Sequence, residues 1–345
     1  MTSDEVSRRL HGAIPVKSRF TGPRLPHISL TLRLCILVLI AIFPAIVIQG
    51  YNEYELRKAR EADIRQQVIQ ITRQFGEEIG ELREGARQLL LALAQLPAVR
   101  LRDTDSCSEH FTALKSQYEN YSLLAAADTE GRIFCSSAPP TSWSVSDQPF
   151  FRRAMARDGL AVGNYWGNPA TGQKMIHFAV RFGDGDGRTA GVVFAGLDLG
   201  WLSEHLKERG LPETSSILIA DREGNIIARL PNPEALVGKN MRRSHEAIMD
   251  GSTAGWEEAV GVDGTTRIFG YVPPALPPKD FFLSAGQSKA EAFAAIDDAT
   301  KRGIALIVFG LLSATLAAVR AAHSRRFAWC HPHQRPLPTL RSSRP

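Results

Sequence analysis

The chain has 345 residues, 44% of them hydrophobic, which is enough apolar material for one large or two modest domains with buried cores. Its formal net charge is +5, but residues 1–33 carry a net +4 and residues 320–345 a net +6, so residues 34–319 carry about −5. A nucleic-acid-binding protein usually carries its positive charge on a folded face, so this distribution argues against nucleic acid as a partner.

Two apolar segments lie beside the basic ends. The first, LCILVLIAIFPAIVI, belongs to a membrane helix predicted over residues 29–50, and the second, GIALIVFGLLSATLAAV, predicts another over residues 303–319. About 20 apolar residues cross a bilayer as a helix. A buried core helix or, for the first segment, a cleaved signal peptide gives the same pattern, but no A-x-A-like cleavage site follows the first segment. We therefore expect two uncleaved membrane helices.

The distribution of Lys and Arg predicts the orientation. Both basic ends, residues 1–28 and 320–345, are expected in the cytoplasm, which leaves residues 51–300 on the far side of the membrane. Lys301 and Arg302 lie on the unfavourable flank of the second membrane helix, where their side chains can extend outward to the interface.

Residues 51–98 predict a long stalk helix. Apolar residues follow one another at steps of three and four from Ile64 to Leu96, and no proline interrupts this stretch before Pro97. Such a stripe packs either along a globular body or against a second copy of the chain, and the second alternative predicts a homodimer.

A short motif occurs twice in the exported region. AADTEGRI at 126–133 and IADREGNI at 219–226 each read as an Asp-x-x-Gly turn between two strands. Further strand and helix signals follow each copy, which predicts two tandem modules at 99–207 and 213–287. A helix over 288–302, opened by Ser288 and Glu291 at capping-box spacing, then leads to the second membrane helix.

Two of the four cysteines, Cys107 and Cys135, fall in the exported region, where an oxidising compartment permits a disulfide. A bridge between them would stabilise the fold by roughly 3–4 kcal/mol in the chain-entropy model. Two unpaired thiols are the alternative.

These features together resemble a double Cache sensor domain. The resemblance covers residues 51–300 and is carried by the long helix, both Asp-x-x-Gly hairpins, and the segments SDQPFFRRAM, GNYWGNPATGQKMIHFAV and GVVFAGLDLGWL. It implies an α+β fold with two PAS-like modules on a long N-terminal helix between two transmembrane helices of a bacterial inner membrane. It also implies a small-molecule ligand in the membrane-distal module, residues 99–207 (the distal module), and a signal passed through the membrane-proximal module, residues 213–287 (the proximal module), to the second membrane helix.

Relatives of this kind continue into a histidine kinase, a diguanylate cyclase or a chemoreceptor signalling region. Here the residues after Arg320 carry no catalytic signature, and their arginine, proline and histidine content predicts disorder. We therefore expect a sensor that is not itself an enzyme. The alternatives are the regulatory half of a kinase or cyclase that lost its catalytic region by truncation or frameshift, and a decoy or dimerisation partner.

The resemblance also implies a ligand site. Amino-acid receptors of this family carry an Arg-x-Trp-Tyr signature whose arginine, together with a later aspartate, holds the ligand. Aligned on Pro149, the matching positions are Gln148 for the arginine, Phe150 and Phe151 for the two aromatic residues, Asp198 for the aspartate and Trp143 for an earlier tyrosine.

The replaced arginine changes the expected ligand, because an amide cannot match a guanidinium group that grips a carboxylate in bidentate fashion. An α-amino acid is therefore disfavoured, whereas Asp198 within an aromatic cage favours an amine-bearing or cationic group. The cage would comprise Trp143, Phe150, Phe151, Tyr165 and Trp166, although aromatic residues in such a module also build cores. His177 is either a pocket residue or an edge histidine, and no cofactor or metal is predicted.

Overall fold

The computed structural model describes residues 30–139, 144–169, 171–184, 186–209 and 215–328. These residues divide into two compact units. The first unit contains the chain up to Asn52 and from Thr300 onward, and the second contains Glu53–Ala299.

The two longest helices are α1, Leu30–Ala94, and α8, Lys289–Ala328. Each contains a stretch that is long and apolar enough to cross a membrane, with mean hydropathies of 1.7 and 1.4, and no residue of these stretches is buried. Length and composition therefore agree with the two predicted membrane helices.

Helix α8 also continues beyond its predicted end. Residues 320–328 are helical, so the prediction of disorder from Arg320 onward is wrong for this segment. The physical reason is that neither glycine nor proline occurs between Val319 and Ala328, and nothing stops the helix there.

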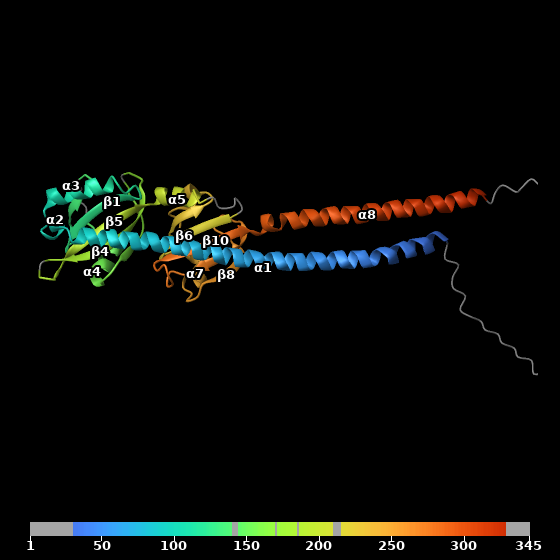
Figure 1. Ribbon diagram of the computed structural model, residues 1–345, viewed down its shortest axis with the longest axis horizontal. Coiled ribbons are helices and arrows are strands. Elements are labelled where there is room, and N and C mark those ends of the chain that lie inside the picture. The colour runs from blue at the N-terminus through green and yellow to red at the C-terminus, as the bar shows by residue number, and fades with distance from the viewer. Residues whose placement is uncertain (1–29, 140–143, 170, 185, 210–214, 329–345) are drawn as a thin grey trace, which may run out of the picture. The chain divides into compact units, whose positions relative to one another are not determined.

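The distal module contains a five-stranded antiparallel sheet with the strand order β2-β1-β5-β4-β3. Strands β1, β4 and β5 of this sheet are labelled in Figure 1. Helix α4 lies between β2 and β3 in the sequence, and α5 follows β5. The elements are α2 (Pro97–Arg100), α3 (Thr104–Lys115), β1 (Tyr121–Asp128), β2 (Ile133–Ser136), α4 (Pro149–Ala156), β3 (Ala161–Gly167), β4 (Lys174–Gly183), β5 (Thr189–Asp198) and α5 (Leu199–Lys207).

The proximal module repeats this arrangement with the strand order β7-β6-β10-β9-β8. Its elements are β6 (Ser215–Asp221), β7 (Ile226–Leu230), α6 (Pro233–Leu236), α7 (Arg242–Met249), β8 (Gly255–Val260), β9 (Thr266–Val272) and β10 (Phe281–Ser288). When the strands of each module are numbered from one to five along the chain, both sheets have the same spatial order, 2-1-5-4-3. This repeat confirms the predicted α+β fold of two tandem PAS-like modules.

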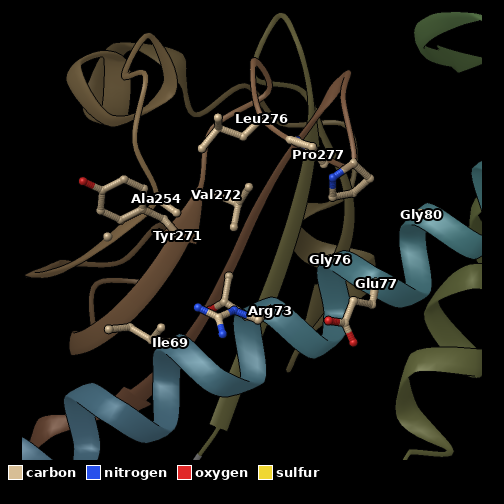
Figure 2. Close-up of a pocket in the computed structure, with 13 residues that line it drawn as sticks. Ile69, Arg73, Gly76, Glu77, Gly80, Ala254, Tyr271, Val272, Leu276 and Pro277 are labelled. Carbon is tan, nitrogen blue, oxygen red and sulfur yellow. The ribbon is translucent and has the colours of Figure 1, made fainter.

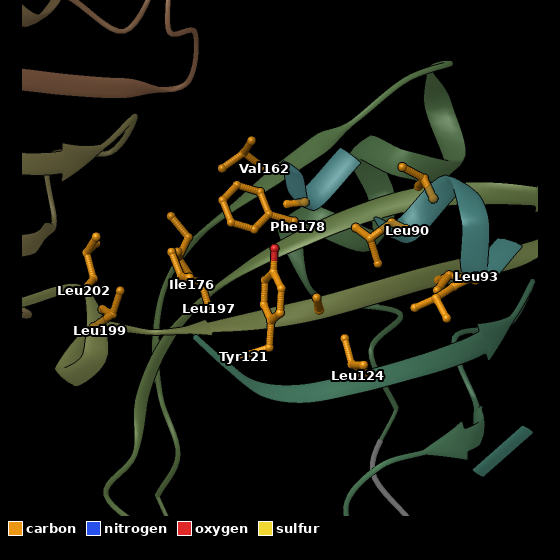
Figure 3. Close-up of a cluster of buried hydrophobic side chains, with 14 of the residues drawn as sticks. Leu90, Leu93, Tyr121, Leu124, Val162, Ile176, Phe178, Leu197, Leu199 and Leu202 are labelled. Atoms are coloured by element: carbon orange, nitrogen blue, oxygen red, sulfur yellow. The ribbon is translucent and has the colours of Figure 1, made fainter. Parts of the chain in front are cut away.

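Helix α1 packs against one face of both sheets. Ile64 and Val68 contact Ile268 of the proximal module in one apolar cluster. Further along α1, Leu90 and Leu93 join a larger cluster with side chains of the distal sheet (Figure 3). The apolar stripe of residues 64–96 is therefore used for packing on the chain's own modules.

The repeated Asp-x-x-Gly motif forms the turn of the first hairpin in each module. Asp128 Oδ1 accepts from the backbone N–H groups of Glu130 and Arg132, at 3.0 and 2.9 Å. Asp221 Oδ1 accepts in the same way from Glu223 and Asn225, both at 2.9 Å. A short side chain that satisfies turn amides explains why the chain uses the same residues twice.

The predicted disulfide is confirmed. Cys107 of α3 is bonded to Cys135 of β2, with Cα atoms 5.8 Å apart, and both residues are buried. Helix α3 had not been predicted; it begins after Asp103, whose side chain caps its first turn by accepting from the Ser106 N–H.

Candidate functional site

A group of stacked rings lies on the face of the distal sheet that α4 covers. His177 of β4 stacks on Phe150 of α4 with ring centroids 4.5 Å apart. Trp166 of β3 and Phe194 of β5 meet the same imidazole edge-on, at 5.7 and 6.1 Å. Three strands and one helix thus bring aromatic side chains around a single polar residue.

The imidazole of His177 is almost fully buried, with 2% of the residue exposed. Its Nε2 has no hydrogen-bond partner within the part of the chain that the structure describes. Burial lowers the pKa of His177 to about 3, because the charged form would lose its hydration. At neutral pH the ring is therefore uncharged and can form one further hydrogen bond at Nε2.

Two other predicted residues on α4 lie near this group. Phe151 is buried and belongs to the same small apolar cluster as Phe150 and Phe194. Gln148 is the N-cap residue of α4, half-buried, and its side chain makes no capping hydrogen bond. Trp143 lies outside the described residues.

The structure does not bring Tyr165 to this group. Tyr165 pairs with Ile176 and packs against the cluster on the α1 face, whereas its neighbour Trp166 pairs with Met175 on the α4 face. Its backbone N–H donates to Asp221 Oδ2 at 2.7 Å, and a Cβ added at Gly238 would lie 2.7 Å from its hydroxyl oxygen. Tyr165 therefore joins the two modules.

Asp198 lies at the end of β5, where it caps helix α5. Its Oδ1 accepts from the backbone N–H groups of Gly200 and Trp201, at 2.7 and 3.0 Å. Its Oδ2 accepts from Gln173 Nε2 at 3.0 Å. By strand alternation from Phe194, Asp198 belongs to the α4 face, at the end of the sheet rather than among the rings.

The structure also contains a cavity that sequence reasoning missed. Figure 2 shows it between α1 and the segment around Val272 and Leu276. Its volume is about 510 Å³, and Gly76 and Gly80 of α1 leave room for it. It lies on the α1 side of the proximal sheet, so it is separate from the ring group around His177.

Two buried arginines of the proximal module, Arg229 and Arg267, were missed as well. Each lies in a mostly apolar strand, IIARL or TRIFGYV, and a charged residue in such a strand is the sequence signal that could have revealed them. Among the described residues, no three His, Cys, Asp or Glu side chains come together in a way that could hold a metal ion.

Two PAS-like sheets on one long helix, with a buried polar residue under α4 of the distal module, define the architecture of a double-module sensor domain. The chain belongs to the Cache family, because residues 56–296 match the family model of a Cache domain of the double-Cache type. Cache domains are sensor domains and not catalytic ones. A search of curated proteins found no match.

Several solved structures share the fold. The extracellular domain assigned to the histidine kinase rpHK1S-Z16 is 18% identical, with a TM-score of 0.57 over 66% of this chain and 95% of that chain. The ligand-binding domain of the Pseudomonas fluorescens chemoreceptor CtaA, in complex with L-isoleucine, is 20% identical, with a TM-score of 0.53 over 70% and 98%. That of the Pseudomonas aeruginosa chemoreceptor PctB, in complex with L-Arg, is 20% identical, with a TM-score of 0.51 over 68% and 90%.

Proposed function

We propose that the chain is a two-pass inner-membrane sensor whose distal module binds a small amine-bearing ligand on the α4 face of its sheet. The observation that carries this proposal is His177, a buried polar residue among aromatic rings whose Nε2 lacks a hydrogen-bond partner in the described part of the chain. Leaving a buried polar group unpaired costs about 1–3 kcal/mol, which a ligand that supplies the missing partner would recover.

The chemistry of the surroundings supports an amine. A neutral imidazole can accept a hydrogen bond from an ammonium or amine group, and the rings of Phe150 and Trp166 offer π-faces to a cation. The carboxylate of Asp198 would add an opposite charge at the end of the same face. CtaA and PctB, which share the fold, bind L-isoleucine and L-Arg, but Gln148 replaces the arginine that would hold an α-carboxylate.

Ligand binding would require a local movement. Phe150 and His177 already touch, and a Cβ added at Gly163 would lie 3.2 Å from Phe150 Cβ, so this region is tightly packed. A ligand next to His177 would therefore push α4 and β3 apart. Strand β3 is linked to the proximal module through Tyr165 and Asp221, and β10 of that module leads directly into α8.

A shift of this kind would reach α8 and, through it, the second membrane helix. Helix displacements of one or two ångströms are sufficient in known switches, provided that the ligand binds the two states unequally. In the homodimer predicted from the sequence, a second copy of α1 would be present, and this assembly stays a prediction.

The ligand proposal is tested on the full chain in nanodiscs by thermal unfolding in the presence of polyamines, simple amines, amino acids and organic acids. A ligand with amine character should raise the unfolding temperature of the native chain and of His110→Phe, a control on the exposed side of α3. His177→Phe, which keeps an aromatic ring, should remove the shift. The proposal fails if no compound shifts the native chain or if His177→Phe responds normally.

The topology is tested separately by protease treatment of intact spheroplasts. Cleavage within residues 51–300 from outside is the expected result. Protection of this region from external protease, with cleavage only after lysis, would contradict the proposed orientation.

A further inference from the structure

The proximal module contains a buried cluster of charges. Arg229 of β7 and Arg267 of β9 have side chains only 5% and 10% exposed. Asp263 lies between them: its Oδ2 accepts from Arg229 Nη2 at 2.9 Å and its Oδ1 from Arg267 Nη1 at 2.5 Å. Across the described residues, these two guanidinium groups form ion pairs with one carboxylate, which leaves an excess of one buried positive charge.

The hydrogen bonding of this cluster is also incomplete. The Nε atoms of both arginines are buried and have no acceptor within the described part of the chain. Burial lowers the pKa of Arg229, Asp263 raises it and the neighbouring Arg267 lowers it again. Arginine nevertheless stays charged in proteins, so the excess charge and the unpaired donors persist at neutral pH.

A cavity of about 30 Å³ lies beside the two guanidinium groups. The residues that line it include the polar Ser216 and His245 and the apolar Leu218, Phe269 and Phe282. This volume is enough for one or two water-sized groups, which matches a carboxylate and excludes a large ligand. His245 reaches the cavity from α7, whose backbone departs from helical geometry at this residue.

We propose that this cavity is a second ligand site, which binds the carboxylate of a monocarboxylate of the size of formate or acetate. Guanidinium groups bind carboxylates through paired, charge-assisted hydrogen bonds, and such an anion would balance the excess charge. The apolar wall would contact the hydrogen atom of formate or the methyl group of acetate. The site lies in the other module from the proposed amine site and does not depend on it.

The position of the site indicates how ligand binding would act on the second membrane helix. Ser284 of β10 also lines the cavity, and β10 continues directly into α8. Met241, the N-cap residue of α7, and His245 within α7 line the same cavity. Binding would therefore act on the last strand before α8, one module closer to the membrane than the ring group.

The experiment uses the full chain in detergent, with thermal unfolding and calorimetric titration as readouts. Sodium acetate and sodium formate are compared with sodium gluconate at equal ionic strength, because gluconate carries the same charge but is too large for the cavity. Acetate should raise the unfolding temperature in a saturable manner, and gluconate should not. Equal effects of the two salts would overturn the proposal.

Variants locate the effect within the chain. Arg267→Met should weaken acetate binding at least tenfold, whereas Arg243→Met, on the exposed side of α7, should leave it unchanged. Asp263→Asn removes the competing carboxylate and should strengthen acetate binding several-fold. A normal response of Arg267→Met would refute the site, and if that variant does not fold, unchanged or weaker binding by Asp263→Asn would refute it instead.

Discussion

The turn aspartates Asp221 and Asp128 allow a quantitative prediction about the contact that joins the two modules. Asp221 is fully buried, and its Oδ2 accepts from Tyr165 N at 2.7 Å and Asn225 Nδ2 at 2.9 Å. Asp221→Asn keeps one oxygen for the two turn amides but places an NH₂ group opposite the Tyr165 N–H. The loss of a buried bond to a charged acceptor costs about 1.5–3 kcal/mol.

The matched control is Asp128→Asn in the distal hairpin. Asp128 makes the same two turn bonds, but its Oδ2 accepts from Arg132 Nε, and the Arg132 side chain is 72% exposed. That guanidinium can turn to water when its partner is lost, so the expected cost is about 1 kcal/mol or less.

The assay is thermal unfolding of the full chain in detergent at neutral pH. Since 1 kcal/mol corresponds to about 2–4 °C for a unit of this size, Asp221→Asn should lower the unfolding temperature by about 3–12 °C. Asp128→Asn should lower it by at most about 4 °C. Equal shifts for the two variants would refute the reasoning that the Tyr165 bond joins the modules.

Three further predictions concern single features of the distal module. In urea unfolding, dithiothreitol should lower the unfolding free energy of the native chain by about 3–4 kcal/mol but leave that of a Cys107→Ala, Cys135→Ala double variant unchanged. An equal response of both proteins would contradict a stabilising disulfide. At Gly131 φ is +80° and an added Cβ would lie 2.5 Å from a backbone nitrogen, whereas at Gly172 φ is +71° and an added Cβ would lie in open space. Gly131→Ala should therefore lower the unfolding free energy by about 2 kcal/mol more than Gly172→Ala, and similar losses would show that the contact relaxes. The pKa of His177 is about 3 in the folded chain and about 6.5 in the unfolded chain, so the unfolded chain binds a proton at a higher pH. The unfolding free energy should therefore fall as the pH decreases from about 6.5 to about 3, and His177→Phe should weaken this dependence. Parallel pH profiles of the native chain and the variant would refute the assignment.

The sequence predicted the architecture well because its strongest signals are periodic. The two apolar segments, the stripe on α1 and the repeated Asp-x-x-Gly turns each follow from local chemistry, and the structure has the corresponding helices and hairpins. Helix α3 was missed because its twelve residues, TDSCSEHFTALK, are mostly polar and only Cys107 and Phe111 are buried.

The predicted site was less accurate because side-chain direction depends on register. Tyr165 and Trp166 are adjacent in a strand, so they must point to opposite faces, and this alternation alone excludes a cage that contains both. The dual role of Asp198 as a helix cap follows from α5 beginning immediately after it. The pairing of Arg229 with Arg267 around Asp263 depends on the order of strands, which the sequence does not display.

The contacts of α3 with β2 have a consequence for solubility. Strand β2 is an edge strand of its sheet, and the unpaired backbone groups of an edge strand can pair with strands of other chains. The Ser136 N–H is instead taken by Ser108 Oγ of α3 at 3.3 Å, and the neighbouring Cys107–Cys135 bond holds the helix there. Formation of the disulfide would therefore help to protect this sheet edge from adding strands of other chains and so from aggregation.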